Sequence, residues 1–253
     1  MWTTWSLHAL GHNGEVTTIY YESDADPAVL SGQRVAVVGY GNQGRSWALN
    51  LRDSGCDPMV CVRPDASREQ AASDGFDTHD VSAANGADVI CLLVPDDVVP
   101  LLGIAPGPRS CVIVASGYTL AFGRLSPPGD AGMVAPRMRG PEVRRCYEEG
   151  VGFITAVGVQ HDVTSTALAR VLAVARAIGG LRQGGIELTP MHEAVLDLGV
   201  EQVLSPALTA VNNAFVQTML ARGIPVEAIL TELILSGEVE RTYRLLREVG
   251  YAV

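Results

Sequence analysis

The chain has 253 residues, of which 47% are hydrophobic and 18% charged, a composition typical of a globular protein with a sizeable core. Lys plus Arg number 18 and Asp plus Glu 28, so the formal net charge is -10. An acidic surface repels phosphate backbones, which argues against nucleic-acid binding. No run of about 18 uncharged apolar residues is present, so we expect no membrane-spanning helix.

The N-terminal residues 1–18 lack the basic start and apolar run of a signal peptide. The five cysteines form no CxxC pair, and Cys61, Cys91 and Cys111 fall inside apolar strand-like runs. We therefore expect free, buried thiols in a cytoplasmic protein rather than disulfides or a metal cage.

Strand and helix patterns alternate over the first two thirds of the chain. Apolar, β-branched runs predict strands at residues 34–38, 59–62, 88–94, 111–116, 132–136 and 152–159. Helical patterns lie between the earlier runs, up to Gly55 and then over residues 67–73 and 81–85. The alternation predicts an α/β fold, a Rossmann-type parallel sheet wrapped on both faces.

The pattern becomes helical from Thr164 onward. One helix ends at Gly179-Gly180, and long helical patterns follow over residues 189–222 and 225–248. We expect a nucleotide-binding domain over residues 1–183 and an all-helical, dimerising domain over residues 184–253. Apolar side chains on more than one face of these helices, such as Leu208 and Phe215, need to be buried against a partner subunit, as in a homodimer, or against the nucleotide-binding domain.

A glycine-rich loop follows the first predicted strand and opens a helix. It reads GxGxxG and comprises Gly39, Tyr40, Gly41, Asn42, Gln43 and Gly44. The first glycine permits the tight turn, the second lets the backbone approach a pyrophosphate, and the third lets helix and strand pack closely. The loop therefore predicts a dinucleotide cofactor.

The end of the second predicted strand favours NADPH over NADH. An acidic residue there would bind the ribose hydroxyls, whereas this strand continues into Arg63, Ser67 and Arg68. The two arginines suit a 2'-phosphate, with Ser67 as a hydrogen-bond donor. Asp65 would repel that phosphate, so a solvated Arg–Asp pair is the alternative.

Several blocks of the sequence resemble ketol-acid reductoisomerase of the short form. They occur in the family's order from about Ile19 to Tyr251, and they are IYYESDAD, RVAVVGYGNQGRSWALNLRDSG, VICLLVPDD, MVAP, AIGG and DLGVEQ. The resemblance implies an NADPH-binding Rossmann domain, a helical dimerising domain and a small-molecule substrate. It also places Val94, Pro95 and Ser116 beside the cofactor.

The resemblance is weakest at the catalytic positions. Ser116 stands where the family carries a histidine, and Arg137 where it carries a lysine. Arginine cannot shuttle a proton near neutral pH. Arg137 binds an anionic substrate group or forms an ion pair in this interpretation, and Ser116 orients the substrate.

The family's two Mg²⁺ ions are held by carboxylates. Asp197 and Glu201 keep the four-residue spacing that places both on one helix face. Glu232 matches the first glutamate of a later pair, Ser236 replaces the second, and the family continues beyond the position of Val253. We therefore expect no two-metal site, although Asp197 and Glu201 would bind Mg²⁺ if it is retained. Without metal, these carboxylates would protonate a product or stabilise an iminium.

These features favour an NADPH-dependent reductase of a C=O or C=N bond in specialised biosynthesis, without the family's alkyl migration. Hydride transfer needs only a bound nicotinamide, a positioned electrophile and one proton donor. Two alternatives stay open: a non-redox cyclase or isomerase on the same fold, and a non-catalytic binding homologue.

Overall fold

The structure is a computed structural model that describes residues 17–249, so nearly all of the stretch inspected for a signal peptide lies outside it. The strands are β1 (Ile19–Tyr20), β2 (Val35–Val38), β3 (Met59–Cys61), β4 (Thr78–His79), β5 (Val89–Leu92), β6 (Cys111–Val114), β7 (Asp130–Pro136), β8 (Thr155–His161) and β9 (Gly185–Glu187). The α-helices are α1 (Asn42–Asp53), α2 (Ala66–Ser73), α3 (Tyr118–Ala121), α4 (Gly140–Glu148), α5 (Ala167–Ala177), α6 (Pro190–Gly199), α7 (Ser205–Ala221), α8 (Val226–Leu230) and α9 (Glu238–Val249). Short 3-10 helices occupy Glu22–Asp24, Pro27–Leu30, Val81–Gly86 and Val99–Leu101, and π-helical turns occupy Val200–Leu204 and Thr231–Leu235.

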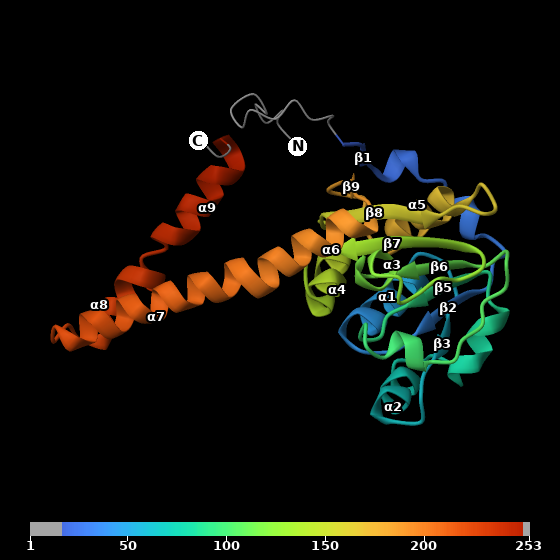
Figure 1. Cartoon of the computed structure of the whole chain (residues 1–253), viewed down its shortest axis with the longest axis horizontal. Coiled ribbons are helices and arrows are strands. Elements are labelled where there is room, and N and C mark those ends of the chain that lie inside the picture. The colour runs from blue at the N-terminus through green and yellow to red at the C-terminus, as the bar shows by residue number, and fades with distance from the viewer. Residues whose placement is uncertain (1–16, 250–253) are drawn as a thin grey trace. The chain divides into compact units, whose positions relative to one another are not determined.

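The described strands form one sheet in the order β1-β9-β8-β7-β6-β5-β2-β3-β4 (Figure 1). The α/β, Rossmann-type fold is confirmed, but the sheet is mixed rather than wholly parallel. The neighbouring strands among β2 to β7 all pair in parallel, whereas β8 runs antiparallel to β7 and β1 antiparallel to β9. The reason is that the connection carrying α4 does not cross the sheet, since the end of β7 at Pro136 pairs with the start of β8 at Thr155.

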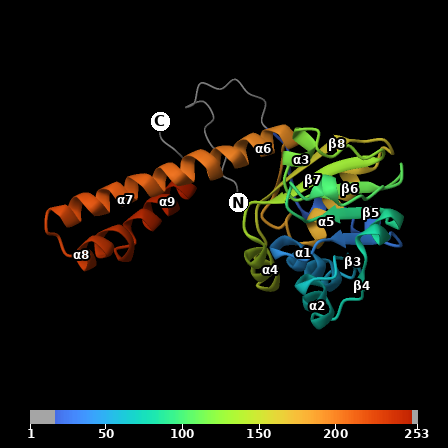
Figure 2. The ribbon, with the colours of Figure 1, turned by 60° about the horizontal axis from the view of Figure 1, so that its bottom comes forward.

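The central strands are buried on both faces, as their continuous apolar runs predict. Along β5, Val89 and Cys91 face one apolar core, while Ile90 and Leu92 face another, because successive strand residues alternate in direction. Helices α1 and α5 close the first core with fully buried Trp47, Leu51, Val171, Val174 and Ile178. Figure 2 shows α1 and α5 against the sheet.

All five cysteines are free, as expected. Cys61, Cys91, Cys111 and Cys146 are buried and Cys56 is half-buried. Burial raises the pKa of the Cys61 thiol to about 11 and that of Cys111 to about 12, with a smaller contribution from Asp130 to the pKa of Cys111. These thiols are therefore inert apolar residues rather than nucleophiles.

The sheet forms a compact unit from Thr17 to Leu196, and a second unit contains the chain from Asp197 onward. The domain boundary expected between residues 183 and 184 stays a prediction. Strand β9 follows that boundary in the chain and still belongs to the sheet unit, because Gly185–Glu187 pair with both β8 and β1. Three strand residues are too few to show a sequence periodicity.

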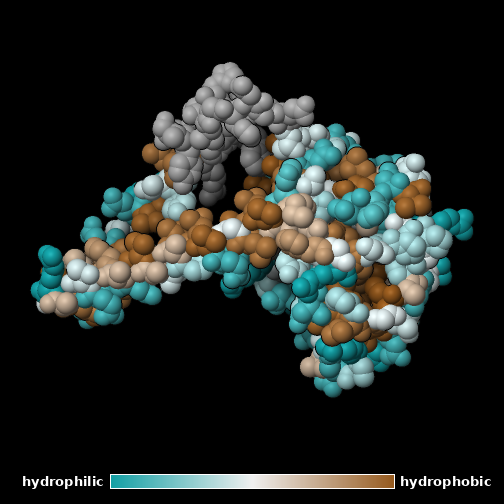
Figure 3. All heavy atoms as spheres, viewed as in Figure 1, coloured by the Kyte–Doolittle hydropathy of each residue, from teal (hydrophilic) through white to brown (hydrophobic). Residues whose placement is uncertain are grey.

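The helical unit leaves most of its apolar side chains exposed in this single chain. Helix α7 has no buried residue, and apolar side chains recur along it in the space-filling view (Figure 3). Leu204, Leu208, Val211 and Phe215 are all exposed. The continuous helix Pro190–Ala221 is long and apolar enough to cross a membrane by length and composition alone. That is weak evidence, since the stretch also carries Asp197 and Glu201.

Candidate active site

The three loop glycines have different physical roles. Gly39 has a positive φ of 94°, and a Cβ there would lie 2.7 Å from the carbonyl oxygen of Leu93. A Cβ on Gly44 would overlap the carbonyl oxygen of Gly39, so the third glycine permits helix α1 to approach the strand end. Gly41 is exposed, and a Cβ there would meet nothing within 4 Å. Gly41 thus leaves open space at the N-terminus of α1, where a pyrophosphate would bind.

Two adjacent hollows lie at the carboxyl ends of the parallel strands. One has a volume of about 210 Å³ and is lined by Gly39, Tyr40, Gly41, Arg63, Ser67, Val94 and Pro95. The other has a volume of about 350 Å³ and is lined by Gly41, Asn42, Gln43, Val94, Pro95 and Ser116. They share Gly41, Val94 and Pro95, and so form the two ends of one groove, which we call the cofactor groove. Of the predicted cofactor residues, only Gly44 and Arg68 do not line it.

The two candidate phosphate-binding arginines differ in their surroundings. The Arg63 side chain is 71% exposed, with its Nε atom 3.7 Å from Asp65. The Arg68 guanidinium instead donates to the carbonyl oxygen of Val62 at 2.7 Å and to Asp80 at 2.6 Å. Arg68 Nη2 therefore connects the ends of β3 and β4, and the role of Arg68 in phosphate binding stays a prediction.

A polar network holds the glycine loop from the α2 side. The Tyr40 hydroxyl donates to Asp74 at 2.9 Å, and Arg45 donates to both Asp74 oxygens at 2.7 and 3.0 Å. Hydrogen bonds from Arg45 and Tyr40 lower the pKa of Asp74 to about 2. Burial, and then the bond to Asp74, raises the pKa of Tyr40. Tyr40 is thus a neutral donor that fixes the loop, a role that the motif alone does not indicate.

The substrate end of the groove contains Ser116, which directly follows β6. Its Oγ atom accepts a 3.3 Å hydrogen bond from the backbone N–H of Tyr118. Tyr118 packs its ring on Phe122, with 4.9 Å between ring centroids, and the Arg124 guanidinium lies over the Tyr118 ring at 5.4 Å from its centroid. Ser116 keeps its own proton available for a substrate oxygen, whereas Tyr118 is a packing residue.

A buried ion pair lies beside this end of the groove. Glu193 of α6 is 1% exposed, and its two carboxylate oxygens accept hydrogen bonds from Arg137 Nη1 at 2.7 Å and from the backbone N–H of Gly117 at 2.6 Å. A Cβ on Gly117 would overlap the carbonyl oxygen of Pro190, so this glycine lets the loop after β6 reach α6. Arg137 is therefore an ion-pair partner, the second of the two roles expected for it.

Glu193 is the site residue that sequence reasoning missed. Its partner Arg137 is 56 residues away in the chain, and no spacing rule links them. A signal was present, because Glu193 precedes Asp197 by one helical turn beside apolar Ala194. A carboxylate on the apolar side of a helix needs a buried cation or donor.

The candidate metal ligands lie in the helical unit beyond Leu196. Glu201 is exposed within the π-helical turn Val200–Leu204, and Glu232 is exposed within the second turn, Thr231–Leu235. The Ser236 hydroxyl donates to the carbonyl oxygen of Glu232 at 2.8 Å. Asp197 is half-buried. Neither π-turn was predicted, and such turns are frequent at functional sites.

Magnesium binding by these residues stays a prediction. Among residues 17–249, no three His, Cys, Asp or Glu side chains gather closely enough to hold a metal ion. Asp197 and Glu201 supply two carboxylates, and Mg²⁺ bound through one or two carboxylates takes its remaining oxygen ligands from water and substrate. The dinucleotide does fit the described residues, because the cofactor groove combines a glycine loop, a helix N-terminus and the exposed Arg63.

A Rossmann-type sheet with this groove at its carboxyl edge defines a dinucleotide-dependent oxidoreductase. Residues 29–184 match the NADPH-binding domain of acetohydroxy acid isomeroreductase. A ketol-acid reductoisomerase (NADP(+)) from Caldivirga maquilingensis is 42% identical over 225 residues, which cover 85% of this chain and 69% of that protein. The chain therefore belongs to the acetohydroxy acid isomeroreductase family, also called ketol-acid reductoisomerases.

Solved structures support the same assignment. An NADH-preferring ketol-acid reductoisomerase from an uncultured archean superposes with a TM-score of 0.83 at 29% identity, over 92% of this chain and 74% of that one. An imine reductase from Myxococcus stipitatus has a TM-score of 0.60 at 18% identity, over 85% of this chain and 76% of that one. At that identity the second similarity shows a shared fold alone.

Proposed function

We propose that the chain is an NADPH-dependent reductase of a small molecule with a C=O or C=N bond, acting in specialised biosynthesis. It does not perform the alkyl migration of its family. The observation that carries this proposal is the ion pair between Arg137 and the buried carboxylate of Glu193.

Arg137, held in this ion pair, cannot carry a proton at the end of the groove near Ser116. The family resemblance implies a lysine at the position of Arg137, and a lysine can lose its proton when its pKa is lowered by burial. Arg137 is permanently charged, and it donates to a carboxylate whose other oxygen is bound by the Gly117 N–H. Alkyl migration needs acid–base help as well as metal ions, and this arrangement does not supply it.

Two further substitutions support the same conclusion. Ser236 stands where the resemblance implies a second glutamate, and its hydroxyl is bonded to the helix backbone at Glu232. Ser116 stands where it implies a histidine. A serine hydroxyl orients a carbonyl oxygen but does not titrate near neutral pH.

Hydride transfer alone makes fewer demands on these residues. A bound nicotinamide would supply the hydride for the carbon of C=O or C=N, and this chain would supply the one proton that the oxygen or nitrogen takes up, so that the products are an alcohol or an amine and oxidised cofactor. We assign Ser116 to orienting the substrate. Asp197, Glu201 and Glu232 are the candidate groups for protonating the product or stabilising a cationic iminium.

We infer NADPH rather than NADH as the reductant. The matched family domain binds NADPH, and Arg63 and Ser67 line the end of the groove where a 2'-phosphate would lie. A similar solved structure prefers NADH, so the choice is specific to each member of the family. In this chain it depends chiefly on Arg63.

The test is NADPH consumption, followed at 340 nm, with a panel of ketones and cyclic imines. Turnover of at least one compound that persists in EDTA supports a metal-free reductase. Product formation without NADPH would instead favour a cyclase or isomerase. Ligand binding with no turnover across the panel would favour a non-catalytic homologue.

The complete isomeroreductase reaction is the second candidate. Identity of 42% to a named ketol-acid reductoisomerase across most of the chain favours it. It predicts that NADPH oxidation requires Mg²⁺ and an acetohydroxy acid. Calorimetric titration of NADPH and NADH, each with Mg²⁺ and with EDTA, separates the candidates at the binding step. Binding that Mg²⁺ strengthens supports the complete reaction, and binding indifferent to it supports the reductase.

We further propose that the protein is a cytoplasmic homodimer. The exposed apolar side chains of α7, including Leu208 and Phe215, need a covering surface. A second copy of this chain supplies one with matching hydrophobicity. The free, largely buried cysteines are suited to a reducing compartment.

A further inference from the structure

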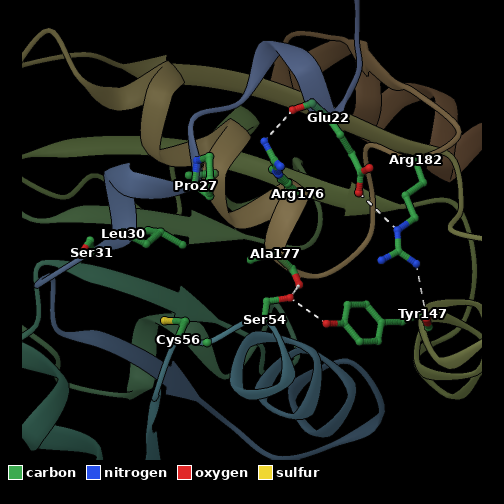
Figure 4. Close-up of a pocket in the computed structure, with 12 residues that line it drawn as sticks. Glu22, Pro27, Leu30, Ser31, Ser54, Cys56, Tyr147, Arg176, Ala177 and Arg182 are labelled. Carbon is green, nitrogen blue, oxygen red and sulfur yellow. Dashed lines mark hydrogen bonds and ion pairs between the residues drawn. The ribbon is translucent and has the colours of Figure 1, made fainter. Parts of the chain in front are cut away.

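A second cavity lies within the sheet unit, at the ends of helices α1 and α5. It has a volume of about 500 Å³, within the range of small-molecule sites. Its walls come from the two 3-10 helices after β1, the loop after α1, and helices α4 and α5 (Figure 4). We call it the α1–α5 cavity.

This cavity is separate from the cofactor groove. Helix α1 has 12 residues, which corresponds to a length of about 18 Å. Gly41, at its N-terminal end, lines the groove, whereas Ser54 and Cys56, beyond its C-terminal end, line the cavity. No residue lines both, so the proposed reductase chemistry does not account for this cavity.

One wall of the cavity is cationic. Arg176 Nη1 donates to the carbonyl oxygens of Glu22 at 2.8 Å and Ala25 at 2.6 Å, and Arg182 Nε donates to the Glu22 carboxylate at 3.2 Å. These bonds fix both guanidinium groups at the cavity. In residues 17–249, neither Nη2 atom has a protein acceptor, so both are available to a ligand. Two arginines against one glutamate leave a net positive charge.

Two hydroxyl groups, those of Ser54 and Tyr147, also line the cavity. The Ser54 hydroxyl donates to the carbonyl oxygen of Ala177 at 2.7 Å and lies 2.7 Å from the Tyr147 hydroxyl. Because Ser54 has one proton and Ala177 takes it, Tyr147 donates to Ser54. These hydroxyls satisfy one another and the end of α5, so the arginines remain the groups that select the ligand.

Apolar residues also line the cavity, among them Pro27, Leu30, Cys56 and Ala173. In Figure 4 the Leu30 and Cys56 side chains, with Ser31 beside Leu30, lie across the cavity from Arg182 and Tyr147. A ligand that fills the cavity therefore needs an anionic group at one end and a hydrocarbon body at the other.

We propose that the α1–α5 cavity is a second binding site, for a small aliphatic carboxylate. The planar guanidinium groups of Arg176 and Arg182 match a carboxylate head. The hydrocarbon chain packs against Pro27 and Leu30, where it leaves water.

Alkylation of Cys56 reports occupancy of this site without any activity measurement. Cys56 lines the cavity and is the one cysteine of the five that is not fully buried. Burial, and then Asp57, raises the pKa of its thiol, so labelling with N-ethylmaleimide is run at pH 8.5. The probe is octanoate, with octanamide and octylammonium as neutral and cationic controls. Labelling of the Cys56 peptide is quantified by mass spectrometry.

Octanoate should slow Cys56 labelling at least about fivefold at saturation, while both controls leave the rate unchanged. The Arg182→Gln variant should raise the octanoate concentration for half-protection about tenfold, as for one lost charged hydrogen bond. Arg34→Gln removes an exposed charge outside the cavity and should change nothing. Arg182→Lys keeps the charge and should raise the octanoate concentration for half-protection less than Arg182→Gln does.

Three outcomes would overturn the proposal. They are no protection by octanoate, equal protection by octanamide or octylammonium, and protection that Arg182→Gln leaves intact. The comparison of probes uses the unaltered protein, so it holds even if a variant unfolds. Because labelling needs neither NADPH nor turnover, failure here is independent of the proposed reductase function.

Discussion

Helices α1 and α7 show how differently one chain can use an apolar helix. Helix α1 has 12 residues, seven of them buried, and it connects the glycine loop to the core. Helix α7 has 17 residues, none of them buried in the single chain. The first helix finds its packing surface within its own sheet unit. The second presents Leu208, Val211 and Phe215 to whatever covers it. We therefore expect cofactor binding to be local to the sheet unit, and we expect the helical unit to need a covering surface.

The largest effect is expected at the glycine loop that precedes helix α1. Gly41→Val adds a side chain in open space, so the fold should persist, but the pyrophosphate position is filled. We expect the NADPH dissociation constant to rise at least about 1,000-fold, or about 4 kcal/mol. Titration calorimetry measures it. Gly86→Val, at an exposed glycine outside the groove, is the control and should bind normally.

The second-largest effect is expected at helix α7 of the helical unit. Replacing Leu208 and Phe215 together by glutamate puts charges on the face that we assign to the dimer. The dimer dissociation constant should rise at least about 100-fold, because uncompensated buried charge opposes association. Light scattering across a dilution series measures it. Gln217→Glu, on the same helix, should leave the mass unchanged. A monomeric parent protein would contradict the dimer.

The third effect concerns the ion pair between Arg137 and Glu193 within the sheet unit. Glu193→Gln removes the charge that balances Arg137 and should destabilise the sheet unit by about 2 kcal/mol. Urea unfolding, with equal slopes for both proteins, measures the change. Glu187→Gln, a half-buried carboxylate on β9, serves as a comparison and should cost less. Equal losses of unfolding free energy in Glu193→Gln and Glu187→Gln would exclude a special stabilising role for the ion pair.

Cofactor choice should show a smaller, selective effect. Arg63→Ala should raise the dissociation constant of NADPH about tenfold and leave that of NADH almost unchanged, since only NADPH carries the 2'-phosphate. Parallel calorimetric titrations measure both. Arg68→Ala should weaken the two cofactors equally, because its bonds hold strand ends. Equal effects of Arg63→Ala on both cofactors would exclude the phosphate contact.

The smallest effect is the pH dependence of the loop network. Asp74 has a folded-state pKa of about 2, below its ordinary value of 3.8. The stabilisation is therefore complete above about pH 5 and lost as the pH falls toward 1, and we expect about 1 kcal/mol after allowing for solvent screening. The free energies of unfolding of the parent and Asp74→Asn should approach one another as the pH falls through 2 toward 1. A constant gap across this range would exclude the linkage.

Much of the sheet unit is predictable from sequence because its signals are local. The runs that became β2, β3, β5, β6, β7 and β8 are mostly apolar, and GxGxxG identifies the groove. Strands β1, β4 and β9 have two or three residues, which is too short for periodicity to register. The antiparallel pairing of β8 with β7 was not predicted, because strand direction depends on where α4 packs rather than on the composition of the strand.

The catalytic end is less predictable because its contacts are between distant residues. Glu193 and Asp74 each pair with an arginine from another element, and neither pairing follows from spacing. Arg68 is the residue type expected of a phosphate ligand, but its Nη2 atom donates to the neighbouring carbonyl oxygens of Val62 and His79. A residue type indicates what a side chain can do, and only the fold determines which partner it meets.

The central claim is reduction without alkyl migration, and one incubation tests it most directly. The protein is mixed with NADPH, Mg²⁺ and an acetohydroxy acid, and mass spectrometry follows the products, alongside a ketone or imine that the same preparation reduces. The account predicts unchanged acetohydroxy acid and reduction of the second compound alone. A dihydroxy acid formed in step with oxidised NADPH would contradict it and show that the complete isomeroreductase reaction survives in this chain.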